Sequence, residues 1–432
     1  MKTTRKWQTA PRSMHFSFCI ICLQCSSAMN GFAQAPGSTT AVPATPPSLS
    51  TNNGDFWTQD ELTGDWGGYR EWLKDHGVSM GLDWVTQGFE NFRGGLNTGT
   101  AVASTADLSI TFDTEKMGGW QGGEFHVDLE DHAGPDPSQD LVGDVQKFTN
   151  LNYTPFLQVA ELWVQQTAFN NTLRIKLGKV DANTEFSVID NGLPFLNSSA
   201  QDSPTIIMFP TFPDDMPGAN VFFTPNDTFY ASFGAYYATR GDRFLDITGA
   251  PQAAQLTEDA MFFIGETGLK WKRLCSLQED GNIRLGFWGD TGTFPSLGGG
   301  RKEGTHGIYA IADQTLWKPT PQEDETRGLR LFMEYAQSPG DVSIVDRHIG
   351  GGLTWTGFFA GRPKDIMGIS PQYVHLSDGA ALPKSYELAV EGFYQYQITG
   401  WASIQPDLQY IRHPAGQYPD ALVGTLQLEV HF

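Results

Sequence analysis

The chain closes with the stretch Leu422-Val423-Gly424-Thr425-Leu426-Gln427-Leu428-Glu429-Val430-His431-Phe432. In its second half every other residue is apolar, and Gln427, Glu429 and His431 stand between the apolar ones. Successive side chains of a β-strand point to opposite faces of the sheet. The stretch therefore predicts a strand with one face against an apolar medium and the other against water.

The same period of two begins after Gly77 and continues to the end of the chain. It predicts sixteen strands, an even number as single-chain outer-membrane barrels require. We expect them near residues 78–90, 106–113, 124–130, 157–168, 172–179, 219–224, 228–239, 262–272, 282–290, 306–316, 327–336, 347–358, 366–376, 385–397, 400–412 and 421–432. The fold class is then all-β, a sixteen-stranded antiparallel transmembrane barrel with residues 78–432 as the porin domain.

The predicted connections support this topology. Barrels of this class alternate short periplasmic turns with longer outside loops. The odd connections at 91–105, 131–156, 180–218 and 240–261 are long, whereas the even ones include the very short 169–171. A secreted β-sandwich or β-propeller also alternates, but one unbroken series of hairpins favours a single closed sheet. After the N-terminal leader no apolar run reaches the roughly 18 residues of a helical span.

Residues 1–35 have the layout of a secretory signal peptide. Basic residues precede the apolar run from Met14 to Leu23, and cleavage after Ala33 or after Ala35 fits the small residues that follow. We expect residues 36–56 to be a disordered Pro/Thr/Ser-rich lead-in. Residues 57–77 have helical spacing and predict a short N-terminal helical segment on the periplasmic side.

The charge and the cysteines limit the classes of function. A net charge of −21 makes nucleic acid a poor partner. Cys275 is the single cysteine after the leader, so the mature chain forms no internal disulfide; it falls in a predicted periplasmic turn. No Gly-x-Ser-x-Gly, His-Glu-x-x-His or phosphate-loop motif occurs. We therefore expect no enzyme and no cofactor, and the alternatives are an outer-membrane hydrolase barrel and a secreted sugar-binding β-protein.

Several motifs resemble the carbohydrate-selective outer-membrane porin (OprB) family. They are Leu62-Thr63-Gly64-Asp65-Trp66-Gly67-Gly68-Tyr69-Arg70, the segment from Gly118 to His126, the segment from Gly178 to Phe186, and Gln405-Pro406-Asp407-Leu408-Gln409-Tyr410-Ile411. The resemblance covers the chain after about residue 57 and implies a passive diffusion channel for small sugars in the bacterial outer membrane. Its partners would be small carbohydrate solutes, membrane lipid, and the barrel-assembly machinery through the last strand ending in Phe432. The sugar that is preferred and assembly as a homotrimer stay open.

The alternation also selects side chains that would line the channel. A charged side chain facing lipid costs about 2 to 4 kcal/mol at the bilayer midplane, so the charged positions should face inward. A sugar channel needs such groups to replace the solute's hydration shell without binding it tightly. The inward candidates are Arg174, Lys176, Glu266, Lys270, Arg284, Arg330, Glu334, Glu391, Gln405, Asp407 and Gln409.

The long connection at 180–218 would be the third outside loop, which in porins commonly folds inward to narrow the lumen. It would then bring Asp181, Asn183, Glu185, Phe186, Asp190 and Asn191 into the channel. The alternative is a Pro-rich external flap. We favour the constriction.

Two further groups have a simpler explanation than solute or metal binding. Trp163, Trp288 and Trp401 fit an interfacial aromatic girdle better than sugar stacking. His126, Asp128, Glu130 and His132 share one strand face. Such a set could ligate a metal, but a polar lumen wall accounts for it, and we expect no metal.

Overall fold

The computed structural model describes residues 55–238, 245, 247, 260–273, 279–319 and 326–432. These residues all belong to the compact unit Pro46–Phe432. The predicted signal peptide at 1–35, nearly all of the lead-in at 36–56, and Cys275 lie outside the described residues.

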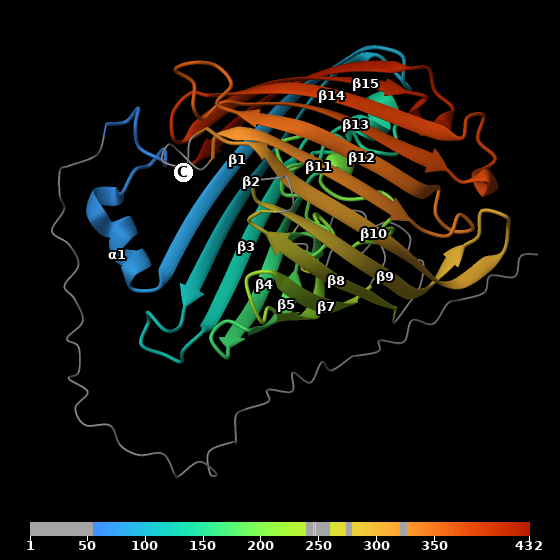
Figure 1. Ribbon diagram of the computed structural model, residues 1–432. Helices are drawn as coiled ribbons and strands as arrows, with labels where there is room; N and C mark the ends of the chain where they lie inside the picture. The colour runs from blue at the N-terminus through green and yellow to red at the C-terminus, as the bar shows by residue number, and fades with distance from the viewer. Residues whose placement is uncertain (1–54, 239–244, 246, 248–259, 274–278, 320–325) are drawn as a thin grey trace, which may run out of the picture. The chain divides into compact units, whose positions relative to one another are not determined.

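The described residues form sixteen antiparallel strands that close into a barrel (Figure 1). Each strand pairs with its neighbours in sequence, and β1 pairs with β16 to close the ring. The strands are β1 (Val78–Arg93), β2 (Gly99–Asp113), β3 (Gly123–Ala133), β4 (Phe156–Ala168), β5 (Leu173–Val180), β6 (Met216–Phe223), β7 (Phe229–Tyr237), β8 (Met261–Trp271), β9 (Gly281–Pro295), β10 (Arg301–Trp317), β11 (Gly328–Gln337), β12 (Val345–Thr356), β13 (Ile366–Leu376), β14 (Tyr386–Gln397), β15 (Ala402–Arg412) and β16 (Ala421–His431). The sixteen-stranded prediction is confirmed.

The first connection is an error of the sequence analysis. The expected long loop at 91–105 is a tight turn, because β1 ends at Arg93 and β2 already begins at Gly99. The missed part of β2 is rich in small residues, since Ala103 faces inward and is buried in an apolar cluster with Phe148. Small side chains that pack beneath another segment give no alternation of large apolar residues, so the strand start was not visible.

The two faces of the wall differ as the alternation predicts. Large apolar side chains such as Val102, Leu285 and Met333 are exposed on the outer face, where lipid would cover them. Polar side chains such as Gln87 and Gln372 are buried inside the barrel. No helix within the described ranges is long and apolar enough to cross a membrane.

The N-terminal segment is tied to the end of the barrel that carries the C-terminus (Figure 1). It contains the short helices η1 (Trp66–Gly68) and α1 (Tyr69–Asp75). Arg70 donates a hydrogen bond to the carbonyl oxygen of Phe432 at 2.9 Å and pairs with Glu61 at 3.2 Å. The Leu-Thr-Gly-Asp-Trp-Gly-Gly-Tyr-Arg motif therefore holds the last residue of the chain.

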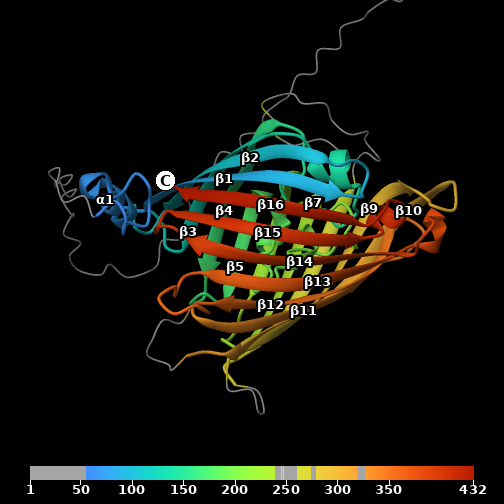
Figure 2. The ribbon, with the colours of Figure 1, turned by 90° about the horizontal axis from the view of Figure 1, so that it is seen from above.

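Two connections at the opposite end fold into the barrel rather than outward (Figure 2). We call them the β3–β4 loop (residues 134–155, with η2, Ser138–Val142) and the β5–β6 loop (residues 181–215, with η3, Ala182–Thr184, and η4, Ser198–Ala200). Two smaller helical turns, η5 (Asp378–Ala380) and η6 (Pro414–Gly416), lie in later connections.

The hydrophobic core lies inside the barrel, between the β5–β6 loop and the wall. Phe195 of the loop packs against Phe332 of β11 and Phe393 of β14, with ring centroids 5.7 and 4.9 Å apart. Phe186 packs against Phe222 of β6 at 5.7 Å. Because these rings are buried, the hydrophobic effect holds the loop in the lumen.

Candidate functional site

Wall carboxylates also fix the β5–β6 loop in the lumen. Glu266 of β8 accepts a hydrogen bond from the backbone N–H of Ser187 at 3.0 Å. Glu391 of β14 accepts from the backbone N–H groups of Leu196 and Asn197 at 2.6 and 3.0 Å. Each of these hydrogen bonds joins a side chain of the wall to a buried backbone N–H group, so the two carboxyl groups hold the main chain of the loop.

The same arrangement repeats at two more places. Asp313 of β10 accepts from the backbone N–H of Asn191 at 2.9 Å. Glu387 of β14 accepts from the backbone N–H groups of Val145 and Gln146 in the β3–β4 loop, both at 3.0 Å. Both inward loops are therefore held through their main chain by acidic residues of the wall.

Several predicted lining residues lie beneath these loops. Gln405 donates to the carbonyl oxygen of Pro194 at 3.1 Å, and Gln409 donates to that of Phe148 at 2.7 Å and to Asp407 at 3.2 Å. Their neighbours in this buried layer are Glu266, Glu334, Glu391 and Asp407, all at most 6% exposed. These side chains face inward and loop residues cover most of them, but Glu266 also lines open space inside the barrel.

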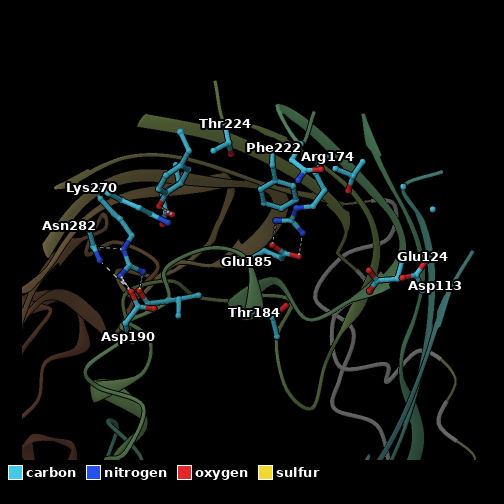
Figure 3. Close-up of a pocket in the computed structure, with 18 of the residues that line it drawn as sticks. Asp113, Glu124, Arg174, Thr184, Glu185, Asp190, Phe222, Thr224, Lys270 and Asn282 are labelled. Carbon is cyan, nitrogen blue, oxygen red and sulfur yellow. Dashed lines mark hydrogen bonds and ion pairs between the residues drawn. The ribbon is translucent and has the colours of Figure 1, made fainter. Parts of the chain in front are cut away.

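Open space remains on either side of the β5–β6 loop. The inner cavity, toward the end with the C-terminus, has a volume of about 700 Å³ and is lined by Glu124, Arg174, Glu185, Lys270 and Arg284 among others (Figure 3). The outer cavity has a volume of about 470 Å³ and is lined by both inward loops. Arg330 lines the space next to the inner cavity, which Lys270 and Asp190 share.

One ion cluster stands at the edge of the inner cavity. Arg174 donates two hydrogen bonds to Glu185, at 2.8 and 2.7 Å, and Lys176 forms an ion pair with the same carboxylate. Burial raises the pKa of Glu185, but hydrogen bonds and charge from Arg174 and Lys176 outweigh it and hold this pKa below its ordinary value. Arg174 also lies over the ring of Phe222, 3.6 Å from its centroid, and both cations are fixed in place.

A second ion cluster lies on the other side of the same cavity (Figure 3). Arg284 pairs with Asp190 and Asp313, both at 2.6 Å, and donates to Asn282 at 3.0 Å. Asp190 belongs to the β5–β6 loop, so this cluster also attaches the loop to β9 and β10. Lys270 points into the cavity nearby.

The short segment from Asp181 to Glu185 separates the two cavities. Asp181 and Asn183 line the outer cavity, whereas Thr184 and Glu185 line the inner one. Asp181 accepts a hydrogen bond from the backbone N–H of Asn183 at 2.7 Å, which shapes the turn η3.

The sequence model of the family described as "Carbohydrate-selective porin, OprB family" matches residues 98–432 of this chain. The chain belongs to this family. It is 24% identical to Porin B of Pseudomonas aeruginosa over 423 residues, covering 86% of this chain and 91% of the relative. It is 23% identical to the putative porin QuiX of Acinetobacter baylyi, covering 89% and 96% of the two chains.

The fold agrees with the family. The high-pH structure of Pseudomonas putida OprB superposes with a TM-score of 0.77 at 22% identity, covering 88% of this chain and all of that one. The protein is therefore an outer-membrane β-barrel porin through which carbohydrates diffuse. The family implies a channel rather than an enzyme.

The tryptophans of this carbohydrate-selective porin differ from the expectation. Trp163 faces inward and stacks on His126 at 4.7 Å, and Trp288 is inside the barrel and 1% exposed. The girdle prediction is wrong for both, because tertiary packing against inward loops requires large rings on the inner face. Trp401 lies at the barrel end that carries the C-terminus and donates to the carbonyl oxygen of Phe56 at 2.9 Å.

The four polar residues of β3 form part of the inner wall. His126 Nε2 lies 4.0 Å from Asp128 Oδ2, and His132 stacks on Phe156 at 5.4 Å. Glu130 accepts from Gln158 at 3.2 Å. Within the described part of the chain no group of three or more His, Cys, Asp or Glu residues is placed to hold a metal ion.

Sequence reasoning missed the contribution of the β3–β4 loop. Gln146, Lys147, Asn150 and Tyr153 line the outer cavity, although the segment was expected to be an ordinary outside loop. The one available signal was the acidic Glu387, which shares a strand face with the inward candidate Glu391 but was not among the predicted lining residues. Its hydrogen bonds to residues far away in sequence are what bring this loop inward.

Proposed function

We propose that the narrowest part of the channel is formed by Asp181, Asn183 and Glu185 of the β5–β6 loop with Arg174 and Lys176 of β5. We call these five residues the constriction. The observation that supports this assignment is that one short segment borders both the outer and the inner cavity. Monosaccharides, small oligosaccharides and related polyols would pass here, with weak binding on the way.

The chemistry of the constriction suits sugars. Its carboxylates, amide and cations can accept and donate hydrogen bonds to hydroxyl groups, which replace water around the solute. Because Glu185 is already satisfied by Arg174 and Lys176, a sugar competes with existing contacts and binds weakly. Weak binding allows release to the periplasm.

The other residues that we predicted to contact sugar lie outside the constriction. Lys270, Arg284 and Arg330 line the inner cavity and its extension, and we propose that they meet the solute after the constriction. Glu266 also lines the inner cavity, whereas loop residues cover Glu334, Glu391, Gln405 and Asp407. For all five, contact with sugar stays a prediction.

The constriction is tested by single-channel current in a planar bilayer, with glucose and maltose as blockers. We expect Glu185→Gln to change the duration of sugar-induced block by about threefold or more, because a net hydrogen bond is worth about 0.5 to 1.5 kcal/mol. The matched control is Glu90→Gln, an exposed position of β1. If the duration of sugar-induced block were the same as in the wild type in both Glu185→Gln and Asp181→Asn, the proposal would be overturned.

We also propose that the protein has no catalytic activity, that residues 1–35 are removed as a signal peptide, and that the assembly machinery engages β16 with its terminal Phe432.

We further propose that three copies of the barrel assemble into a homotrimer. A hollow on the lipid-facing side, lined by Leu353, Trp355, Ile369 and Leu408, supports it because side chains of a neighbouring barrel would fit there. N-terminal sequencing, hydrolase assays and mass measurement in detergent test these points.

A further inference from the structure

The outer cavity contains polar groups that the constriction does not use. Gln146 lines it and is 1% exposed. Its backbone N–H is bound to Glu387 at 3.0 Å, so its main chain is fixed. Neither Nε2 nor Oε1 of its side chain has a hydrogen-bond partner among the residues that the structure describes.

A second side chain of the outer cavity also has a buried polar atom without a hydrogen-bond partner among the described residues. Asn150 also lines the outer cavity, and its Oδ1 is buried without a hydrogen-bond partner among the described residues. Buried polar groups of proteins are nearly always paired. An amide that needs both a donor and an acceptor is matched by a hydroxyl group, which supplies both.

The charges around the cavity restrict the solute further. Lys147 is already engaged, since its Nζ donates to the Tyr153 hydroxyl at 3.3 Å and lies 4.6 Å from the centre of that ring. Asp181, Asp202 and Asp214 add three carboxylates to the lining against this one cation. Burial raises the pKa of Asp202 to about 6, although Lys147 opposes the shift, so it is mostly ionised at neutral pH. An anionic solute would be repelled.

We propose that the outer cavity is a sugar-binding subsite, separate from the constriction, which holds one neutral polyhydroxylated ring through Gln146 and Asn150. The proposal rests on the proposed function in that the permeating solute is a sugar. The volume of about 470 Å³ is within the range of small-molecule sites. Both loops contribute, so the subsite exists only while both are held inside the barrel.

The test uses the full-length mature porin in planar bilayers of known orientation, with glucose added on the loop side. Gln146→Met keeps the size of the side chain and removes its hydrogen bonds. We expect the time that glucose blocks the current to fall about threefold to tenfold, the effect of about one net hydrogen bond. Open-channel conductance should stay the same. The control is Gln417→Met, an exposed glutamine near η6 at the same end of the barrel.

Further arms keep the proposal falsifiable. Asn150→Leu is the second variant if Gln146→Met fails to show heat-modifiable migration. Wild-type block by gluconate from the loop side should be shorter than block by glucose. Equal block by gluconate, or wild-type glucose block in both variants, overturns the subsite. The parallel Glu185→Gln channel reports on the constriction alone, because Glu185 lines the inner cavity; a change there without one in Gln146→Met leaves the proposed function standing and rejects the subsite.

Discussion

Glu185 shows how one side chain sets the charge of the proposed constriction. Its carboxylate is shared by Arg174 and Lys176, so the three residues together carry one net positive charge. The sequence predicted that all three would lie in the channel. It did not predict that they would neutralise one another, because Glu185 reaches Arg174 only after the loop has turned back into the barrel.

Removing that carboxylate should change ion preference. In Glu185→Gln the two cations lose their ionic partner, so we expect the reversal potential in a KCl gradient to shift toward anions. The pKa of Glu185 is held below its ordinary value, after burial is outweighed by Arg174 and Lys176, so the wild-type preference should not change between pH 7 and 5 through this residue. A variant with wild-type reversal potential would contradict the assignment.

Asp202 should make the outer cavity sensitive to pH. Burial raises its pKa to about 6 against the attraction of Lys147, and the charge of Asp181 adds to the rise. As the pH falls from 7 to 5 the carboxyl becomes neutral, so cation preference on the loop side should decrease. In Asp202→Asn this part of the pH dependence should be absent. Reversal potentials at the two pH values measure it, and equal pH responses in both channels would exclude Asp202 as the source.

At the level of elements, the β5–β6 loop is held by the acidic residues of the strands behind it. Glu391→Ala removes the acceptor for two backbone N–H groups. We expect higher and noisier single-channel conductance, because this loop would leave its inward position part of the time. Glu303→Ala, at an exposed position of β10, is the control. Unchanged conductance and noise in Glu391→Ala would show that apolar packing of Phe195 and its neighbours suffices.

The strands were predictable and the contents of the lumen were not. Alternation is a local property, so it located β13 at the residues where the structure has it. It failed at the start of β2, where Ala103 is small because the β3–β4 loop packs on it. Likewise it did not show that Trp288, on the same strand face as Arg284, would be buried against the ring of Phe262, which is remote in sequence. Side-chain direction follows from the period of a strand, whereas cover by a loop depends on contacts that no local pattern records.

At the scale of the whole molecule, the barrel is closed where the first and last strands meet. Arg70 reaches Phe432 at this seam, and Leu62 donates its backbone N–H to the carbonyl oxygen of His431 at 2.8 Å. We expect Arg70→Ala to destabilise the closed barrel by about 1 to 3 kcal/mol, since it removes a charged hydrogen bond. The temperature at which gel migration changes measures this loss. Arg93→Ala, exposed at the far end of β1, should behave as wild type, and equal transition temperatures for the two variants would refute the role of Arg70.

Carboxyl groups of the wall hold both inward loops by their backbone N–H groups, in addition to the contacts of loop side chains such as Phe195 and Asp190. Replacing Asn183 or Asp202 therefore leaves the anchors at Ser187, Leu196 and Asn197 intact. Mutations that change which solute enters can thus accumulate without releasing the β5–β6 loop from the wall. In this arrangement the solute selectivity can change while the barrel and the position of its loops stay the same.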